Sequence, residues 1–171
     1  MSRVPPVPLD ALPPDLGAAV ARGRASRMLS TTLPVQVWAH RPEAAASWLA
    51  TLEAMHLRGV LPGRLKELVR LRIAAITNCK ACQLARKDDS VDADDLACLA
   101  ADSDRFAPAE QAALRYAELF AGDYTAIDDA LFASLECHFT IPEIVELNMF
   151  CALMLAGGRM TYVQQAYEDA P

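Results

Sequence analysis

Two cysteines separated by two residues are the first feature of the sequence that can do chemistry. Cys79 and Cys82 follow directly after Asn78. Asn is a frequent cap at the start of helices, so we expect a helix from Cys79 to about Lys87, with both thiols on one side of it. Two thiols so placed can close a disulfide with little backbone movement, which is how dithiols cycle between reduced and oxidised forms.

The surroundings of the pair favour thiolates. A thiol in the first turn of a helix lies beside free backbone N–H groups and partial positive charge, which stabilise a thiolate at Cys79. Arg86 comes four residues after Cys82, so on a continuous helix its guanidinium can lie over that second sulfur. The pattern therefore indicates thiol redox chemistry.

Two other interpretations of the cysteines stay open. A zinc site needs four ligands, and the sequence has no second CxxC motif and no HxxxH motif. The cysteines could also be core residues by coincidence, as we expect for Cys151 in its apolar surroundings. Cys98 and Cys137 are scattered along the chain. We expect neither a metal nor a cofactor.

Glu67 is the next candidate for chemistry. It precedes Cys79 by twelve residues, which on one continuous helix means a separation of roughly 18 Å. The two residues could cooperate only if the chain turns near Asn78 and folds the CxxC helix back. The alternative is a solvated carboxylate paired with a basic residue nearby. The basic candidates are Arg64, Lys66 and Arg70.

The elements that must position these residues are predicted to be helices. The 171 residues are 53% hydrophobic and only 6% aromatic, with much alanine and few β-branched runs. Residues 64–77 have the clearest amphipathic pattern, with apolar residues at i, i+3, i+4, i+8 and i+11. We expect an all-α bundle of about seven helices, drawn from nine candidate helical segments. The other expected helices cover residues 15–30, 43–58, 79–87, 93–101, 109–121, 127–137, 142–155 and 159–168, the last two separated by a break at Gly157 and Gly158.

The chain is expected to have a Pro-rich N-terminal arm over residues 1–14 and a single all-α domain over residues 15–171, with Asp15 as the first cap. The arm has no apolar segment typical of a signal peptide, and the longest apolar run is far short of the roughly 18 residues that span a membrane. The net charge of −6 argues against a nucleic-acid partner. Five cysteines, an odd count without secretory context, favour a reducing, cytoplasmic location.

The carboxylate and the cysteine pair, taken with their helical context, resemble the carboxymuconolactone decarboxylase / alkylhydroperoxidase D-like family. Its pattern is a Glu twelve residues before a CxxC and a His four residues after the second Cys. Looser similarity extends over about residues 34–167. The resemblance implies an all-α alkylhydroperoxidase D-like bundle that assembles as homo-oligomers, as dimers, trimers or hexamers. The residues that carry it are Leu65-Lys66-Glu67-Leu68-Val69-Arg70-Leu71-Arg72-Ile73-Ala74-Ala75 and Asn78-Cys79-Lys80-Ala81-Cys82.

The resemblance also implies roles for the site residues. In the peroxidase branch of the family, the second cysteine attacks the peroxide and the first resolves the sulfenic acid into a disulfide. By that analogy Cys82 is peroxidatic, Cys79 is resolving, and Glu67 belongs to a proton relay. The implied partners are a peroxide substrate and a dithiol reductant. The helix-start argument instead favours Cys79 as the more acidic thiol, although Arg86 compensates at Cys82.

The sequence departs from the family pattern at Arg86, which stands where the family has its relay His. Arginine stays protonated at working pH, so it can stabilise a thiolate but cannot pass a proton back and forth. Either Glu67 acts through water, or another group such as His56 or His138 takes this place, or turnover is slow.

Three functions follow from these observations. The leading one is a thiol-dependent hydroperoxide reductase, a peroxidase that uses the CxxC dithiol. The second is a carboxymuconolactone decarboxylase-like enzyme, in which Arg86 could bind a substrate carboxylate and the cysteines have no use. The third is a non-enzymatic redox-sensing oligomer that forms its disulfide without sustained peroxide consumption.

Overall fold

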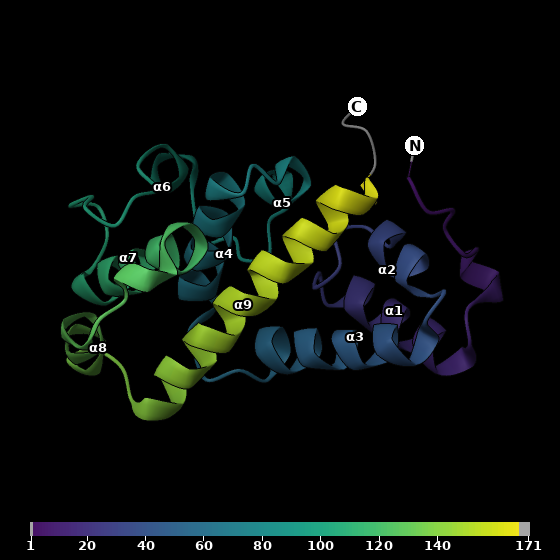
Figure 1. The fold of residues 1–171 in the computed structure, drawn as a ribbon, viewed down its shortest axis with the longest axis horizontal. Helices are drawn as coiled ribbons and strands as arrows, with labels where there is room; N and C mark the ends of the chain where they lie inside the picture. The colour runs from purple at the N-terminus through teal and green to yellow at the C-terminus, as the bar shows by residue number, and fades with distance from the viewer. Residues whose placement is uncertain (1, 168–171) are drawn as a thin grey trace. The chain divides into compact units, whose positions relative to one another are not determined.

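The protein is all helical, as predicted (Figure 1). The computed structural model describes residues 2–167, with only the backbone for residues 80 and 81. This part of the chain holds nine α-helices, two short 3-10 helices and no strand. The α-helices are α1 (Pro14–Ala25), α2 (Leu33–Trp38), α3 (Pro42–Leu57), α4 (Gly63–Ile76), α5 (Lys80–Leu84), α6 (Ala93–Ala97), α7 (Pro108–Gly122), α8 (Asp129–Glu136) and α9 (Ile141–Gln164).

Contacts between residues divide the chain into two compact units. Unit 1 consists of Met1–Arg58 and Arg159–Pro171, and unit 2 of Gly59–Gly158. Helix α9 contributes its first part to unit 2 and its last turns to unit 1. The single domain expected over residues 15–171 stays a prediction.

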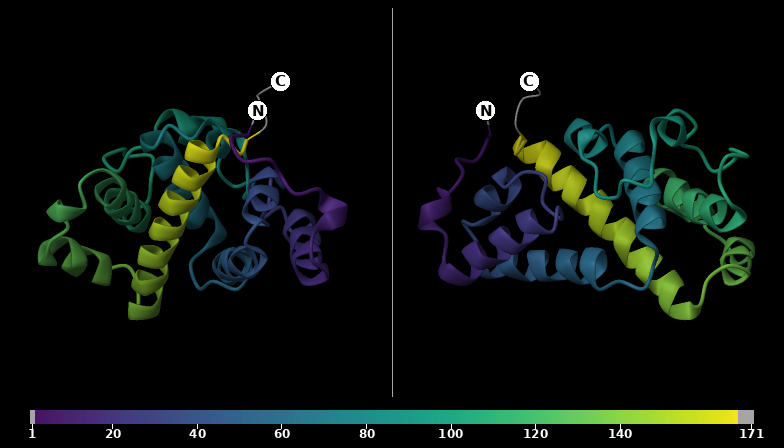
Figure 2. Two further views of the ribbon diagram at one scale, coloured as in Figure 1. Left: turned by 45° about the vertical axis from the view of Figure 1, so that its right-hand side comes forward. Right: turned by 180° about the vertical axis from the view of Figure 1, so that it is seen from behind.

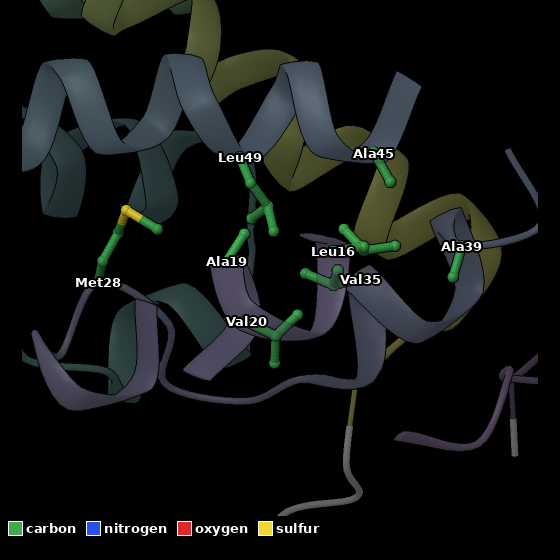
Figure 3. Packing of buried hydrophobic residues seen from close by; sticks show 8 residues of the cluster. All are labelled: Leu16, Ala19, Val20, Met28, Val35, Ala39, Ala45 and Leu49. Carbon is green, nitrogen blue, oxygen red and sulfur yellow. The ribbon is translucent and has the colours of Figure 1, made fainter. Parts of the chain in front are cut away.

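Helices α1, α2 and α3 of unit 1 enclose an apolar core, which Figure 3 shows from close by. Helix α2 is not among the helices predicted from the sequence. Its Pro34 lies in the first turn, where a proline costs no hydrogen bond. The residues of this core are Leu16, Ala19, Val20, Met28, Val35, Ala39, Ala45 and Leu49.

The N-terminal arm is held by hydrogen bonds rather than being wholly extended. The Arg3 amide donates to the Gln164 carbonyl (2.9 Å), and the Val7 amide donates to the Gln36 carbonyl (3.0 Å). The arm also contains a 3-10 helix, Leu9–Ala11. The expected cap at Asp15 is wrong: α1 begins at Pro14, and Asp15 lies inside its first turn.

Unit 2 is organised around α4, which packs most extensively on α7; two further views in Figure 2 show these helices side by side. Helix α4 is buried on nearly all sides, including charged residues, so its apolar stripe marks only part of its contact surface. A second apolar cluster joins α4 to α7 and to the segment between them. Its buried members are Leu68, Leu71, Val91, Phe106 and Leu114.

Helix α9 runs without interruption through Gly157 and Gly158, so the break expected there is wrong. A glycine inside a helix costs about 1 kcal/mol relative to alanine, which the packing of a 24-residue helix can offset. By length and composition alone α9 could cross a membrane, with a mean hydropathy of 1.4, but core helices of other proteins pass the same test. Its outer face leaves three apolar side chains exposed at helical spacing: Ile141, Val145 and Met149.

Candidate active site

The chain reverses direction directly before the cysteine pair. Helix α4 ends at Ile76, and Asn78 adopts a left-handed backbone conformation, with φ at 55°. The Cys79 amide then donates back to the Ala74 carbonyl (2.9 Å). Asn is one of the few residues that tolerate this conformation, and it commonly ends helices in this way. The turn that cooperation between Glu67 and the cysteines requires is therefore present, but Asn78 follows the end of α4 and does not cap α5.

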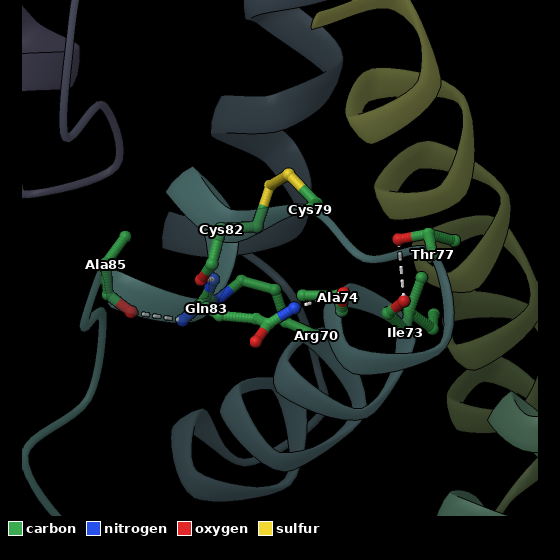
Figure 4. The surroundings of a disulfide bond; sticks show 8 residues. All are labelled: Arg70, Ile73, Ala74, Thr77, Cys79, Cys82, Gln83 and Ala85. Carbon is green, nitrogen blue, oxygen red and sulfur yellow. Dashed lines mark hydrogen bonds between the residues drawn. A yellow bond between two sulfur atoms is a disulfide. The ribbon is translucent and has the colours of Figure 1, made fainter. Parts of the chain in front are cut away.

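Cys79 and Cys82 are joined in a disulfide beside this turn, with their Cα atoms 5.3 Å apart (Figure 4). Cys79 is 6% exposed, whereas Cys82 is half-buried. A Cβ atom placed on Gly158 of α9 would lie 4.0 Å from the Cβ of Cys79, so α9 covers the first cysteine closely. Cys82 is therefore the more exposed residue of the pair.

Glu67 is buried rather than solvated, at 1% exposure. Its two oxygens accept hydrogen bonds from Arg70, from Nε at 2.8 Å and from Nη2 at 2.7 Å, in a bidentate pair one helical turn apart. Oε1 also accepts from the Lys87 amide (3.0 Å). Each carboxylate oxygen is thus engaged by a donor other than a cysteine. The predicted pairing with Arg70 is confirmed, but the pair is buried and not solvated.

Arg70 connects this buried pair to the cysteine segment. Its Nη1 donates to the Cys82 carbonyl (2.6 Å) and its Nη2 to the Ala85 carbonyl (2.7 Å), the second of which is drawn in Figure 4. All three guanidinium nitrogens of Arg70 therefore donate hydrogen bonds at the site. Nε donates to Glu67, Nη1 donates to the Cys82 carbonyl, and Nη2 donates both to Glu67 and to the Ala85 carbonyl. Sequence reasoning treated Arg70 only as one possible partner of Glu67. The i,i+3 spacing of Glu67 and Arg70 was the feature of the sequence that could have predicted their pairing.

A second contact fixes α5 on α4. The Gln83 side-chain amide donates to the Ala74 carbonyl (3.0 Å), and the Gln83 backbone amide donates to the Cys79 carbonyl (2.9 Å). Helix α5 is only five residues long, much shorter than the predicted segment to Lys87. So short a helix has a weak dipole, which removes most of the argument for a specially stabilised thiolate at Cys79.

Arg86 lies beyond the end of α5 at Leu84, so the expected i,i+4 arrangement with Cys82 on one helix is not formed. Its guanidinium donates to the backbone carbonyls of Gln83 and Ala85. A direct role of Arg86 at the Cys82 sulfur stays a prediction.

The remaining cysteines have different surroundings. Cys98 and Cys137 are exposed free thiols, and Cys151 is completely buried. Burial raises the pKa of the Cys151 thiol well above its usual range, which disfavours the reactive thiolate. Within residues 2–167, no group of three or more His, Cys, Asp or Glu side chains is placed to hold a metal ion.

A second ionic group starts on the first turns of α4. Arg64 donates to Asp95 (2.8 Å) and to Glu110 (2.8 Å), and Arg105 donates to Asp95 (2.6 Å) and to Asp92 (2.9 Å). We call Arg64, Asp92, Asp95 and Arg105 the Asp95 cluster. The hydrogen bond from Arg64 holds the pKa of the Asp95 carboxyl well below its usual range.

Comparisons with known proteins support this view of the fold. Residues 42–119 match the model of the carboxymuconolactone decarboxylase family. A search of curated proteins finds no significant match. Among solved structures, the chain is similar to a complex of the debrominase Bmp8, as a Cys-to-Ala variant, with 2,3,4-tribromopyrrole. The TM-score is 0.82 at 16% identity, covering 98% of this chain and 91% of that one.

Two further structures share the fold. One is an uncharacterised peroxidase-related protein with the alkylhydroperoxidase AhpD core from Ralstonia eutropha JMP134, with a TM-score of 0.74, 22% identity, and coverage of 98% of this chain and 92% of that one. The other is a putative antioxidant defence protein AhpD from Agrobacterium tumefaciens, with a TM-score of 0.68, 20% identity, and coverage of 76% and 93%.

The match to the family model includes α4, the turn at Asn78 and the cysteine pair, and the structural similarity extends to almost the whole chain. Residues 42–119 thus match the carboxymuconolactone decarboxylase family, and the chain has the alkylhydroperoxidase D-like fold.

Proposed function

We propose that the protein is a thiol-dependent hydroperoxide reductase whose working centre is the Cys79–Cys82 dithiol. The observation that carries this proposal is the disulfide after the end of α4, in which Cys79 is buried and Cys82 is only partly buried. A peroxidatic cysteine must meet its substrate, whereas a resolving cysteine only has to meet its partner. This asymmetry supports Cys82 as the attacking cysteine and Cys79 as the resolving one.

The reaction consumes one peroxide and two thiols. The Cys82 thiolate attacks one peroxide oxygen, the O–O bond breaks, and the alkoxide leaves as an alcohol after taking a proton. Cys82 is then a sulfenic acid. The Cys79 thiol attacks that sulfur and releases water, which leaves the Cys79–Cys82 disulfide. An external dithiol restores both thiols by exchange through a mixed disulfide.

Proton supply distinguishes this site from the family pattern. The Glu67 carboxylate is held by Arg70 and by the Lys87 amide, and a permanently charged Arg86 replaces the relay histidine. We therefore assign Glu67 a positioning role, through Arg70, and expect the departing alkoxide to take its proton from water. Turnover should be slow compared with an enzyme that has a general acid, which typically contributes about 10²–10⁴-fold.

The proposed chemistry and the exposed surface suggest a cellular compartment and an oligomeric state for the protein. A dithiol that must be reduced in each cycle suits a reducing, cytoplasmic compartment. The exposed apolar side chains of α9, Ile141, Val145 and Met149, suit an interface with a second copy of the chain, whose order sedimentation at several concentrations would measure.

The test is peroxide consumption over many turnovers, with an organic hydroperoxide and dithiothreitol as the reductant. We expect the wild type to consume many equivalents and Cys82→Ser to consume none. Cys98→Ser, which removes an exposed thiol outside the pair, is the matched control and should retain full activity. If the wild type forms the disulfide once and then stops, the protein is a redox sensor and the proposal is wrong.

The same assay separates other activities. Because the chain shares its fold with a debrominase solved with 2,3,4-tribromopyrrole, that compound is an informative second electron acceptor. Dithiol oxidation coupled to bromide release, with no peroxide consumption, would replace the peroxidase proposal. Activity on a carboxymuconolactone that survives Cys79→Ser/Cys82→Ser would instead identify a decarboxylase.

A further inference from the structure

Unit 1 contains a cavity that the dithiol chemistry does not use. It has a volume of about 370 Å³, within the range of small-molecule sites, and all the residues that line it belong to unit 1. Two tryptophans, Trp38 and Trp48, form part of its wall, with ring centroids 6.1 Å apart in an edge-to-face arrangement. Met160 of α9 contributes a further apolar surface. The wall therefore suits a flat, apolar group.

Two polar groups of the cavity, the Gln164 side-chain amide and Arg41, have donors without acceptors among the described residues. Gln164 uses its Oε1 to accept from Trp38 Nε1 (2.9 Å), which leaves the two protons of its Nε2 without a partner among residues 2–167. The Arg41 side chain likewise makes no hydrogen bond or ion pair with any residue that the structure describes. His40 is already committed, because its Nε2 donates to the Pro5 carbonyl (2.8 Å).

We propose that this cavity binds a small aromatic carboxylate. The ring would lie against Trp38 and Trp48, and the carboxylate would accept hydrogen bonds from Arg41 and from the Gln164 amide. We infer an anion from the charge of the cavity. Its wall contains the Arg41 cation and the neutral Gln164 amide, and none of its described lining residues is Asp or Glu. The assignment of an aromatic body rests on the two indoles, since aromatic pairs gain stabilisation beyond buried area.

The protein provides its own reporter for this site. Trp38 and Trp48 are its only two tryptophans, and both line the cavity. Fluorescence excited at a wavelength that selects tryptophan therefore reports on this cavity alone. The probe is 3-phenylpropanoate, and its matched neutral analogue is 3-phenylpropan-1-ol, which keeps the ring and lacks the negative charge.

We expect 3-phenylpropanoate to change the tryptophan fluorescence of the full chain saturably, and the alcohol to bind about tenfold or more weakly. Arg41→Gln should weaken binding of the carboxylate by about the same factor and leave binding of the alcohol unchanged. Arg24→Gln, which removes an exposed arginine of α1 in the same unit, is the matched control and should bind like the wild type. Circular dichroism confirms that each variant is folded.

Three results would overturn the proposal. One is a wild-type fluorescence that does not respond to millimolar carboxylate. Another is equal binding of carboxylate and alcohol, or equal binding by the wild type and Arg41→Gln, which would leave an apolar cavity without an anion site. The third is a fluorescence that changes with protein concentration and not with ligand, which would mean that a second copy of the chain fills the cavity. None of these results depends on the peroxidase activity.

Discussion

The Glu67–Arg70 pair and the Asp95 cluster both involve residues of α4, but they differ in burial and in the segments that they join to α4. The Glu67–Arg70 pair is almost completely buried, with side-chain exposures of 1% and 6%, and its spare donors reach the backbone of the cysteine segment. In the Asp95 cluster only Asp95 is buried, while the side chains of Arg64 and Arg105 are 31% and 36% exposed. That cluster joins α4 to the start of α6 and the segment that follows it.

The difference shows how one chemical pairing can serve two purposes. An exposed arginine–carboxylate contact contributes little to stability, because water competes for both partners. A buried pair costs desolvation and often contributes no net stability, but removing one partner leaves an uncompensated buried charge. We infer that the Asp95 cluster supports a loop, whereas the Glu67–Arg70 pair positions the dithiol.

The largest expected effect comes from breaking the buried pair. Arg70→Met leaves the Glu67 carboxylate buried without its cation, so the free energy of unfolding should fall by about 3–5 kcal/mol. Urea denaturation measures this change. Arg64→Met, in the other group, should cost clearly less, because its side chain is partly exposed. A loss at Arg70 no greater than that at Arg64 would remove the distinction between the two groups.

Removing both partners separates stability from positioning. In Glu67→Leu/Arg70→Met no charge is left buried, so we expect the free energy of unfolding to return to within about 2 kcal/mol of the wild type. The carbonyls of Cys82 and Ala85 still lack their donor, and peroxide consumption per folded molecule should remain about tenfold slower, since small displacements of reacting groups are costly. A double variant with full activity would show that the pair is only structural.

The Asp95 cluster should affect stability and its pH dependence without affecting the dithiol. Asp95→Asn should cost about 1–3 kcal/mol at neutral pH, because a buried, hydrogen-bonded carboxylate is lost. Peroxide consumption should be unchanged.

The sign of the pH effect follows from the lowered pKa of Asp95. In the unfolded chain an aspartate has a pKa of about 3.9, so the contribution of Asp95 to stability is complete above that pH. It is lost as the pH falls further, through the lower pKa of the folded state. The difference in the free energy of unfolding between wild type and Asp95→Asn should therefore become smaller as the pH falls. A gap that widens as pH falls would contradict the assigned ion pairs.

The smallest effect is expected at Arg86. Arg86→His restores the residue type that the family uses as a relay, but the Glu67 carboxylate stays bound to Arg70. We expect peroxide consumption to change by less than about threefold, far from the roughly 10²-fold that a working general acid or base contributes. A large gain in rate would show that Glu67 is free to exchange protons.

The fold was predicted from the sequence better than the contacts around the cysteine pair were. The spacing of Cys79, Cys82 and Glu67, with the strong helix pattern over α4, was sufficient to predict the fold and the match of residues 42–119 to the family model. The turn near Asn78 is a condition for cooperation between Glu67 and the cysteines, but the sequence predicts Asn78 as a cap of the next helix, which is wrong. An Asn can cap the start of a helix with its side chain, and it can also follow the end of a helix in a left-handed backbone conformation. The local sequence does not distinguish these two roles.

Burial of charge was the main feature that the pattern could not predict. Glu67 and Arg70 lie off the apolar stripe of α4, and a charged face normally points to solvent. Here it points to the cysteine segment, whose position depends on the turn at Asn78 and on contacts made by backbone carbonyls. The uninterrupted α9 was missed for a similar reason, since packing along the helix outweighed the local preference of Gly157 and Gly158.

The most direct test of the dithiol mechanism is a thiol count by intact mass on reduced protein given one equivalent of an organic hydroperoxide, with peptide mapping of the disulfide formed. We predict rapid loss of two thiols, mapped to Cys79 and Cys82, with Cys98, Cys137 and Cys151 unchanged. Survival of all five thiols, or oxidation of Cys98 and Cys137 as readily as the pair, would contradict the proposed dithiol centre.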